Sequence, residues 1–319
     1  NLININKYYN GKHILKNINL TVNEKDRIGL IGINGCGKTT LLRILTGKEL
    51  PDRSTEKDGI VSFASKTSVG YLEQMSGLDR DSTVIDEMKS VFSYLDSVLE
   101  RMKELEHIMK ESSEINEEIS EEYSKLSAYY ESNDGYTIDV KIKTILNGMG
   151  FSENDYNRII SGFSGGEKTR LAIAKLLLEE PNLLILDEPT NHLDFKTVLW
   201  LEEYLKDYKG ALLIVSHDRY FINQTATRII ELTNKAIVNY IGNYDYYEEK
   251  KDELTAIYAP KEEQTSSNTP SASTNKQNYL ERKAEQARIR KLKNDILKVE
   301  EKYFLTDHGF RQAKGFSNT

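Results

Sequence analysis

Short runs of alternating apolar and polar residues open the chain and predict β-strands. Residues 2–5 and 18–22 alternate in this way, which is typical of strands with one buried face. Residues 28–31 are more continuously apolar and lead straight into a glycine-rich loop, and the apolar spacing over 39–45 predicts a helix after that loop. A further short strand is predicted over 69–74. This part of the chain therefore has the strand–loop–helix order of an α/β protein.

Strand and helix patterns alternate again in the second half of the globular region. A helix, a strand, a second helix and a second strand are predicted in turn, at residues 171–178, 183–186, 200–208 and 211–215. Because alternating strands and helices build a largely parallel sheet, we expect one α/β core. We expect this core to comprise residues 1–78 and 151–245, with a segment of different character inserted between them.

The inserted segment, residues 79–150, is acidic and helical in pattern. Residues 79–134 contain sixteen acidic and six basic side chains. Apolar residues recur every three or four positions over 84–109 and again over 115–130, which predicts two long helices with a break between them. An antiparallel hairpin follows from this pattern. It is either a projecting arm that contacts a partner or a solvated coiled coil without a specific role.

The C-terminal part of the chain changes character once more. We expect a flexible linker over residues 246–277, because 264–275 is a low-complexity stretch of polar residues and one proline. Residues 278–319 then form a basic helical tail, since 278–303 carries a heptad seam and 276–319 holds eleven basic against six acidic side chains. A basic helix of this kind either binds RNA phosphates or is an ordinary solvated coiled coil.

Composition narrows the class of protein. The chain has 319 residues, a formal net charge of −7 and one cysteine, Cys36. One cysteine excludes a disulfide framework and favours the reducing cytoplasm. No run approaches the roughly 18 apolar residues of a membrane span, so we expect no direct membrane insertion. The negative charge argues against unspecific nucleic-acid binding by the whole surface but leaves room for a local basic patch.

The glycine-rich loop after the third strand carries the first chemical motif. Residues 32–39 fit the pattern G-x-x-x-x-G-K-[ST], in which backbone N–H groups turn inward around phosphate oxygens. We expect Lys38 to reach the β and γ phosphates of ATP and Thr39 to bind Mg²⁺. The full set of expected nucleotide contacts in this loop is Gly32, Asn34, Gly35, Cys36, Gly37, Lys38, Thr39 and Thr40. We also expect a lowered pKa for the Cys36 thiol beside the helix N-terminus, so that its alkylation blocks nucleotide binding and ATP protects it.

A second motif places two carboxylates at the end of a buried strand. Asp187 and Glu188 follow the apolar run 183–186, and buried carboxylates are costly unless a metal or a reaction uses them. We expect Asp187 to bind Mg²⁺ through water and Glu188 to orient and deprotonate the attacking water. Gln74, at the end of its strand, is a candidate bridge between metal and water, and His217, after another strand, is a candidate γ-phosphate contact. The competing interpretation of Asp187 and Glu188 is a buried ion pair. Gln74 could equally be a surface glutamine, and His217 a structural histidine.

Together these motifs resemble an ATP-binding-cassette (ABC) ATPase over roughly residues 1–245. The sequence Ser164-Gly165-Gly166-Glu167 is similar to the signature motif of that superfamily. Residues 188–194 and 216–221 resemble the ABC-F family more specifically, as does a long insertion before the signature. Transporter cassettes usually carry a small-residue pair where this chain has Asn191 and His192, and their insertion is shorter.

The resemblance implies a mechanical cycle. In cassette ATPases, ATP lies between the P-loop of one cassette and the signature of another, so Ser164, Gly165, Gly166 and Glu167 are implied nucleotide contacts for a partner. Tyr9 matches the aromatic residue that stacks on adenine, with Tyr8 as the fallback, and Asp194 matches the residue that couples the two sites. ABC-F proteins act on the ribosome, where closure fits the tRNA exit site. The implied partners are thus the ribosome, through rRNA and tRNA near that site, and a second cassette.

One departure from the family affects the expected assembly. ABC-F proteins usually carry two cassettes, whereas this sequence contains one P-loop and one signature. We therefore expect a homodimer or a second cassette elsewhere, and we hypothesise that the chain joins the start and the end of a tandem protein. The functional hypotheses are an ABC-F translation factor or ribosome-protection protein, the ATPase subunit of a membrane transporter, and a module that binds ATP without turnover.

Overall fold

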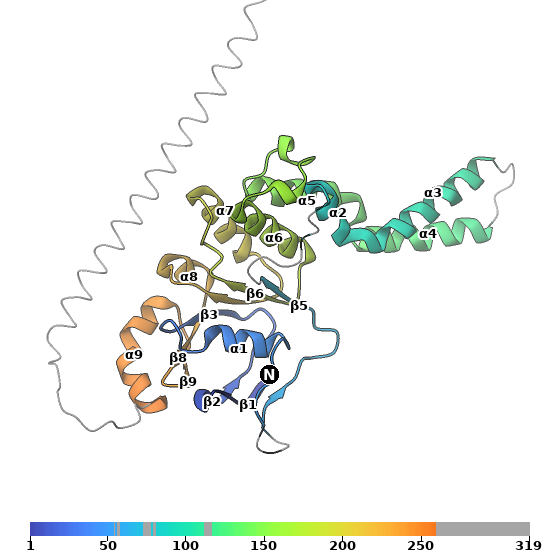
Figure 1. Cartoon of the computed structure of the whole chain (residues 1–319). Helices are drawn as coiled ribbons and strands as arrows, with labels where there is room; N and C mark the ends of the chain where they lie inside the picture. The colour runs from blue at the N-terminus through green and yellow to red at the C-terminus, as the bar shows by residue number, and fades with distance from the viewer. Residues whose placement is uncertain (54, 56–57, 73–77, 79–80, 112–116, 260–319) are drawn as a thin grey trace, which may run out of the picture. The chain divides into compact units, whose positions relative to one another are not determined.

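The computed structural model describes residues 1–53, 55, 58–72, 78, 81–111 and 117–259 (Figure 1). All of the described residues belong to one compact unit, Asn1–Glu262. The predicted low-complexity linker and basic helical tail lie outside the described residues, as does Gln74.

A six-stranded sheet forms the centre of the first unit. The strand order is β5-β6-β7-β3-β8-β9, with β9 antiparallel to β8 and all other neighbours parallel. β6 and β7 are apolar almost throughout because a parallel sheet is covered on both faces. The strands span Arg27–Ile31 (β3), Val69–Leu72 (β5), Leu183–Asp187 (β6), Ala211–Val215 (β7), Arg228–Thr233 (β8) and Ala236–Tyr240 (β9).

A smaller antiparallel sheet, ordered β2-β1-β4, comes from the N-terminal segment. Its strands are Leu2–Tyr9 (β1), Lys12–Leu20 (β2) and Ile60–Val61 (β4). β1 is longer than the predicted strand over 2–5, and β2 starts earlier than predicted, because shifts of register interrupt the alternation of buried side chains. Asn4 and Asn17 take positive φ angles of 49° at these irregularities.

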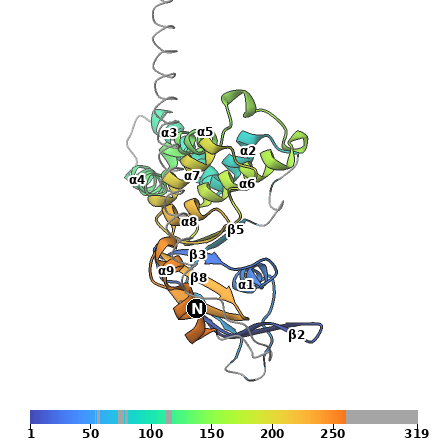
Figure 2. The same ribbon diagram turned by 90° about the vertical axis from the view of Figure 1, so that its left-hand side faces the viewer.

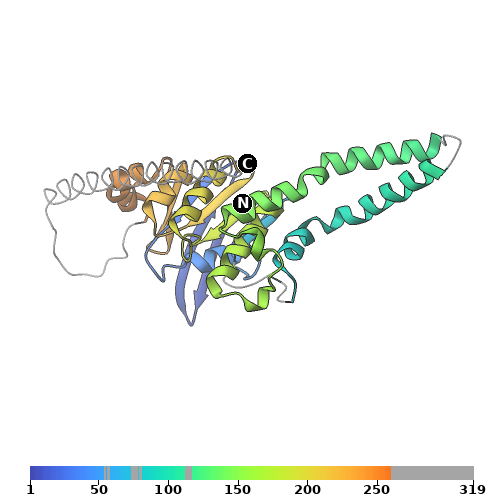
Figure 3. The ribbon, with the colours of Figure 1, turned by 90° about the horizontal axis from the view of Figure 1, so that it is seen from above.

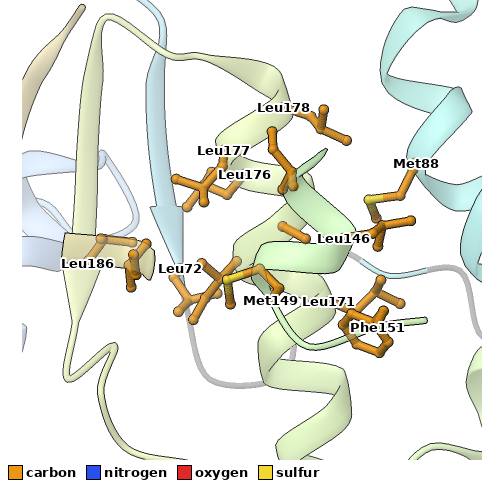
Figure 4. Close-up of a cluster of buried hydrophobic side chains, with 14 of the residues drawn as sticks. Leu72, Met88, Leu146, Met149, Phe151, Leu171, Leu176, Leu177, Leu178 and Leu186 are labelled. Atoms are coloured by element: carbon orange, nitrogen blue, oxygen red, sulfur yellow. The ribbon is translucent and has the colours of Figure 1, made fainter. Parts of the chain in front are cut away.

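Each face of the six-stranded sheet is covered by its own hydrophobic cluster. On one face, helix α1 (Lys38–Leu45) and the antiparallel sheet pack against alternate residues of β3, β6, β7 and β8. On the other face, the buried side chains of β6 and β7 pack against helices. These helices are α2 (Val84–Lys89), α5 (Ile138–Gly148), α6 (Gly165–Glu179) and α7 (Phe195–Lys206). Figure 2 shows these helices, among them α5, α6 and α7, gathered on one side of the sheet. Figure 4 shows Leu72 and Leu186 of the strands in one cluster with Leu171 and Leu177 of α6.

The described residues also form helices and short 3₁₀ segments outside the four helices of this layer. Helices α8 (Arg219–Thr225) and α9 (Tyr244–Tyr258) follow β7 and β9. Short 3₁₀ turns span Gly135–Thr137 (η2), Glu153–Asp155 (η3) and Ile160–Gly162 (η4).

The acidic insertion forms a helical hairpin that runs away from the helical layer (Figures 1 and 3). It comprises α3 (Asp96–Glu111) and α4 (Glu117–Ser132). The bidentate pair of Arg101 with Glu122, at 2.8 and 3.0 Å, joins the two helices. The prediction of one helix over 84–109 was wrong, because a 3₁₀ segment, η1 (Ser90–Leu95), separates α2 from α3. Its Phe92 packs in the main core, whereas Leu95 packs inside the hairpin.

Candidate nucleotide-binding site

The loop between β3 and α1 is shaped by glycines that no other residue could replace without movement. Gly32 has φ 154°, and a Cβ there would lie 2.6 Å from Leu232 O and 2.8 Å from Cys36 Sγ. Gly37 has φ 111°, and its Cβ would lie 2.9 Å from Ile14 Cγ2. The backbone is therefore fixed in a tight turn immediately before the N-terminus of α1, an arrangement that suits an anion.

Lys38 lies back over this loop. Its Nζ donates to Gly32 O at 2.8 Å and to Ile33 O at 3.3 Å. The ammonium group is thus held at the mouth of the turn, where its charge offsets only part of the rise in the pKa of Asp187 that burial and Glu188 cause. The next two residues, Thr39 and Thr40, continue the first turn of α1.

The prediction of a lowered pKa for Cys36 was wrong. Burial raises the pKa of this thiol, and the electrostatic effect of Lys38 and nearby backbone N–H groups offsets burial only in part. The thiol is half-buried against Gly32. It packs against the hydrophobic cluster that α1 and the antiparallel sheet form with β3, β6, β7 and β8. Desolvation of the thiolate therefore outweighs the positive end of α1.

Asp187 and Glu188 leave the sheet at the carboxyl end of β6, next to β7. Asp187 pairs with Val215 in the strand register, and the N–H of Glu188 donates to Val215 O at 2.8 Å. Burial raises the pKa of Asp187, and the neighbouring Glu188 raises it further. Glu188 has φ 50°, a conformation that turns its side chain out of the strand direction. Its Oε1 is buried and accepts no hydrogen bond within the described part of the chain.

His217 connects this acidic edge to the P-loop. Its backbone N–H donates to Glu188 Oε2 at 3.2 Å, and its Nε2 lies 3.5 Å from Glu188 Oε1. The same Nε2 lies 3.1 Å from Asn34 Oδ1, a residue 183 positions earlier. Three loops, after β3, β6 and β7, thus meet at one sheet edge. This contact between Asn34 and His217 was not predicted, because Asn34 was expected only as a phosphate contact.

The signature segment lies in the helical layer, at the start of α6, and not at the sheet edge. Ser164 is the N-cap: its Oγ accepts from the Glu167 N–H at 3.3 Å, and Glu167 Oε2 accepts from the Ser164 N–H at 2.9 Å. This reciprocal cap starts the helix at Gly165, earlier than the predicted 171. A Cβ on Gly165 would meet nothing within 4 Å, so the helix N-terminus is open.

The remaining predicted site residues are Tyr9, its alternative Tyr8, and Asp194. Tyr9 hydrogen-bonds through its hydroxyl to Glu49, and to Thr40 of α1, which places its ring beside the P-loop helix. Tyr8 stacks instead on His13, with ring centroids 4.0 Å apart. Asp194 caps α7 by accepting from the Thr197 N–H and Oγ1, each at 3.0 Å.

Two contacts near the signature were missed from the sequence. His192, with φ 75°, lies against Gly166, where a Cβ would be 3.6 Å from His192 Cβ. Arg158 forms an ion pair with Glu167 at 3.1 Å. His192 was noted only as part of the ABC-F-like segment and Arg158 was not noted at all, because both contacts depend on how loops fold back on α6.

The P-loop on β3, the carboxylate pair ending β6 and the histidine after β7 define the class of ATP-binding cassettes. The family model described as ABC transporter matches residues 15–191, more than half of the chain. The chain belongs to this family of cassette ATPases. A solved ATP-binding subunit of an ABC transporter has the same fold, with a TM-score of 0.55 over 79% of this chain and 93% of that one, at 18% identity.

Relatives include proteins with and without assigned roles. The ATP-binding protein YdiF of Bacillus subtilis is 43% identical over 248 residues, which is 77% of this chain and 38% of YdiF. ABC transporter F family member 5 of Arabidopsis thaliana is 34% identical over 249 residues, 77% of this chain and 35% of that protein. The energy-dependent translational throttle protein EttA of Escherichia coli K12 is 32% identical over 253 residues, 79% of this chain and 44% of EttA.

These comparisons confirm the cassette fold and the resemblance to the ABC-F family. The chain spans less than half the length of each of these three relatives. Among the helices that the structure describes, none combines the length and the apolar character needed to cross a membrane.

Proposed function

We propose that this chain is an ABC-F ATPase that binds Mg-ATP at its P-loop, hydrolyses it through Glu188 and acts on the ribosome. The observation that carries the proposal is the junction of Glu188, His217 and Asn34 beside the P-loop. A carboxylate, an imidazole and a phosphate-binding turn at one sheet edge are the parts that phosphoryl transfer to water requires.

The P-loop supplies the phosphate contacts. The backbone N–H groups of residues 32–40 surround the phosphates, and the Nζ of Lys38 leaves its carbonyl partners for the β and γ oxygens. Tyr9, beside α1, stacks on the adenine. We assign these roles to Gly32, Asn34, Gly35, Cys36, Gly37, Lys38, Thr39, Thr40 and Tyr9.

The residues present fit Mg²⁺. Thr39, Asp187 and Gln74 would hold it, and hard oxygen donors of this kind suit the ion. Within the described residues no cluster of three or more His, Cys, Asp or Glu could hold a metal by itself, which matches an ion bound largely by phosphates and water. When bound, Mg²⁺ neutralises phosphate charge.

Glu188 is the proposed general base. Among the described residues no donor hydrogen-bonds to its buried Oε1, and His217 Nε2 lies 3.5 Å away, so this oxygen keeps the capacity to accept a proton from water. The contact of Oε2 with the His217 N–H fixes the carboxylate while His217 itself contacts the γ-phosphate.

A second cassette completes the site. The signature residues Ser164, Gly165, Gly166 and Glu167 stand at the start of α6, where a Cβ on Gly165 would meet nothing within 4 Å, and we assign them to the ATP of a facing cassette. Asp194 couples the two sites across that interface. The facing cassette is a second copy of this chain or a second cassette of a longer protein.

The ribosomal role rests on relatives and on the hairpin. EttA is named as a translational throttle, and the A. thaliana relative is an F family member. The hairpin of α3 and α4 lies in the segment where the family resemblance implies an arm insertion, which supports this role. We therefore place the chain in the cytoplasm, with rRNA and tRNA near the exit site as partners, as a translation factor or a ribosome-protection protein.

The test measures ATPase rate against protein concentration, with and without purified ribosomes, together with co-sedimentation. Rates that rise faster than linearly and increase with ribosomes support a self-pairing ribosomal ATPase. ATPase activity without ribosome binding would instead indicate a transporter subunit, and ATP binding without any turnover would indicate a cassette that needs a different partner.

A further inference from the structure

One ring nitrogen of His217 faces oxygen atoms from two different loops. Its Nε2 lies 3.1 Å from Oδ1 of Asn34 and 3.5 Å from Oε1 of Glu188. An amide oxygen and a carboxylate oxygen are both hydrogen-bond acceptors, so Nε2 is a nitrogen that carries a proton. The imidazole therefore directs an N–H group at the place where the P-loop meets the carboxyl end of β6.

Asn34 supplies the shorter of these two contacts. A separation of 3.1 Å lies within the ordinary range of a hydrogen bond from N–H to oxygen, whereas 3.5 Å lies beyond it. The side chain of His217 is 60% exposed, so packing alone does not hold its ring in one rotamer. The hydrogen bond to Asn34 is therefore the interaction that orients the imidazole toward the P-loop.

The chemistry of the Asn34 amide separates this role from a phosphate contact. Its Oδ1 can only accept a hydrogen bond, and phosphate oxygens also accept, so Oδ1 is unsuited to phosphate. Its Nδ2 can donate to phosphate, and it donates to no group in the part of the chain that the structure describes. The contact through Oδ1 therefore calls for an explanation that phosphate binding by Asn34 does not provide.

We propose that Asn34 is a positioning residue for His217: in the nucleotide-free chain it holds the Nε2–H at the mouth of the P-loop, where an oxygen of the γ-phosphate accepts the same hydrogen bond. The inference rests on the proposed function, in which His217 contacts the γ-phosphate. The exchange of partners is favourable because a charged phosphate oxygen is a stronger acceptor than an amide oxygen. Asn34 thus removes part of the entropic cost of ordering an exposed ring when the nucleotide binds.

The test is a double-mutant cycle on nucleotide affinity. Calorimetric titration gives the Kd for Mg-ADP and for Mg-AMPPNP, a non-hydrolysable ATP analogue, and the ratio of the two isolates the effect of the γ-phosphate. Asn34→Ala should reduce the preference for AMPPNP over ADP about fivefold, because the ring must then be ordered on binding. In a His217→Ala background, Asn34→Ala should change this preference by less than about twofold, because its effect depends on the imidazole.

A matched control comes from the small antiparallel sheet, where Oδ1 of Asn6 lies 3.2 Å from Nε2 of His13. Asn6→Ala removes an equivalent contact between an asparagine and a histidine, and it should leave the preference for AMPPNP unchanged. Asn34→Ser is a second variant of the proposed residue, which serves if Asn34→Ala fails to fold. Its hydroxyl is too short to reach the imidazole, so we expect it to behave as Asn34→Ala.

Three outcomes would overturn the proposal. An unchanged preference in Asn34→Ala would show that His217 needs no positioning. An unchanged preference in His217→Ala would show that the imidazole does not respond to the γ-phosphate. An equal loss from Asn34→Ala with and without His217 would mean that Asn34 contacts the γ-phosphate itself. The proposed function is tested separately by the wild type, because a chain that binds neither nucleotide would contradict that function as a whole.

Discussion

The Nε2 of His217 lies 3.5 Å from Oε1 of Glu188, and the backbone N–H of His217 donates to Oε2 of the same carboxylate. Two separate loops therefore fix the orientation of the imidazole relative to the carboxylate. Asn34 extends the contact to the P-loop, at 3.1 Å from the imidazole. A change at any of these positions should therefore affect turnover more than folding.

Glu188→Gln should slow ATP turnover by about 10²–10⁴-fold with little change in ATP affinity, because an amide oxygen still accepts from His217 but cannot take a proton from water. Steady-state ATPase and equilibrium nucleotide binding measure the two effects. Glu203→Gln is the control, since Glu203 is exposed on α7 and pairs with Lys206 at 2.7 Å. Turnover at the wild-type rate in Glu188→Gln would remove Glu188 from the role of base.

Asp187→Asn should stabilise the nucleotide-free chain while it abolishes Mg²⁺-dependent ATP turnover. Burial and Glu188 raise the pKa of Asp187, so its ionised form disfavours the folded state. We expect the melting temperature to rise by about 1–2 °C at neutral pH, because solvent screening keeps the gain below about 1 kcal/mol.

The stability difference between Asp187→Asn and the wild type should depend on pH. A carboxyl whose pKa is raised by folding favours the folded state most below its unfolded pKa and loses that advantage as the pH rises through its folded pKa. The difference between Asp187→Asn and the wild type should therefore be largest at neutral pH and vanish in acid. A melting temperature that falls in Asp187→Asn at neutral pH would contradict this account.

Tyr247→Phe should lower the free energy of unfolding by about 1–3 kcal/mol, because it leaves a buried carboxylate short of a donor. Glu231 is 5% exposed and accepts from Tyr247 Oη at 3.1 Å and from Tyr240 Oη at 3.0 Å. Urea unfolding measures the change. Tyr246→Phe, one position away and 38% exposed, should stay within about 0.5 kcal/mol of the wild type. Equal effects of the two substitutions would mean that the hydroxyl of Tyr247 contributes nothing specific.

Buried strands were the easiest elements to predict. β3, β6 and β7 were placed to within one residue, because strands covered on both faces are continuous apolar runs. The ends of α6 and α7 were harder, since the caps Ser164 and Asp194 lie outside the apolar pattern.

Tertiary contacts account for what the sequence could not predict. The apolar spacing continues through η1, but Phe92 and Leu95 pack into different clusters, so the helix breaks there. In the site, the motifs identified Lys38, Asp187, Glu188 and His217 as candidates. The contact of His217 with Asn34 depends on two loops that only the sheet brings together. The sign of the Cys36 pKa shift depends on burial, which local spacing does not reveal.

Alkylation of Cys36 should be slow in the folded chain and should block nucleotide binding. Burial raises the pKa of the thiol, so little thiolate is present at neutral pH, and any added group would press on Gly32. The chain has one cysteine, so iodoacetamide labelling followed by mass spectrometry reports on this site alone. The rate should rise at least about tenfold in urea. Mg-ATP should slow it further, and a native rate equal to that of the unfolded chain would disprove the burial argument.

Gly148→Ala should destabilise the chain by about 1–3 kcal/mol, although the same change in an open helix usually stabilises. A Cβ at Gly148 would lie 2.0 Å from Trp200 Cε2, so the indole of α7 rests directly on the backbone of α5. Trp200 also lines a cavity of about 370 Å³, into which the displaced ring can move.

Because Trp200 is the chain's one tryptophan, its fluorescence reports this displacement directly. The emission should shift to the red as the ring moves toward the cavity and solvent. Gly162→Ala is the control, since a Cβ there meets nothing within 4 Å and stability should change by less than about 0.5 kcal/mol. If Gly148→Ala changed neither the emission maximum nor the stability, α5 and α7 would have moved apart at no cost in free energy. The contact between Gly148 and Trp200 would then not be what holds these two helices of the signature-bearing layer together.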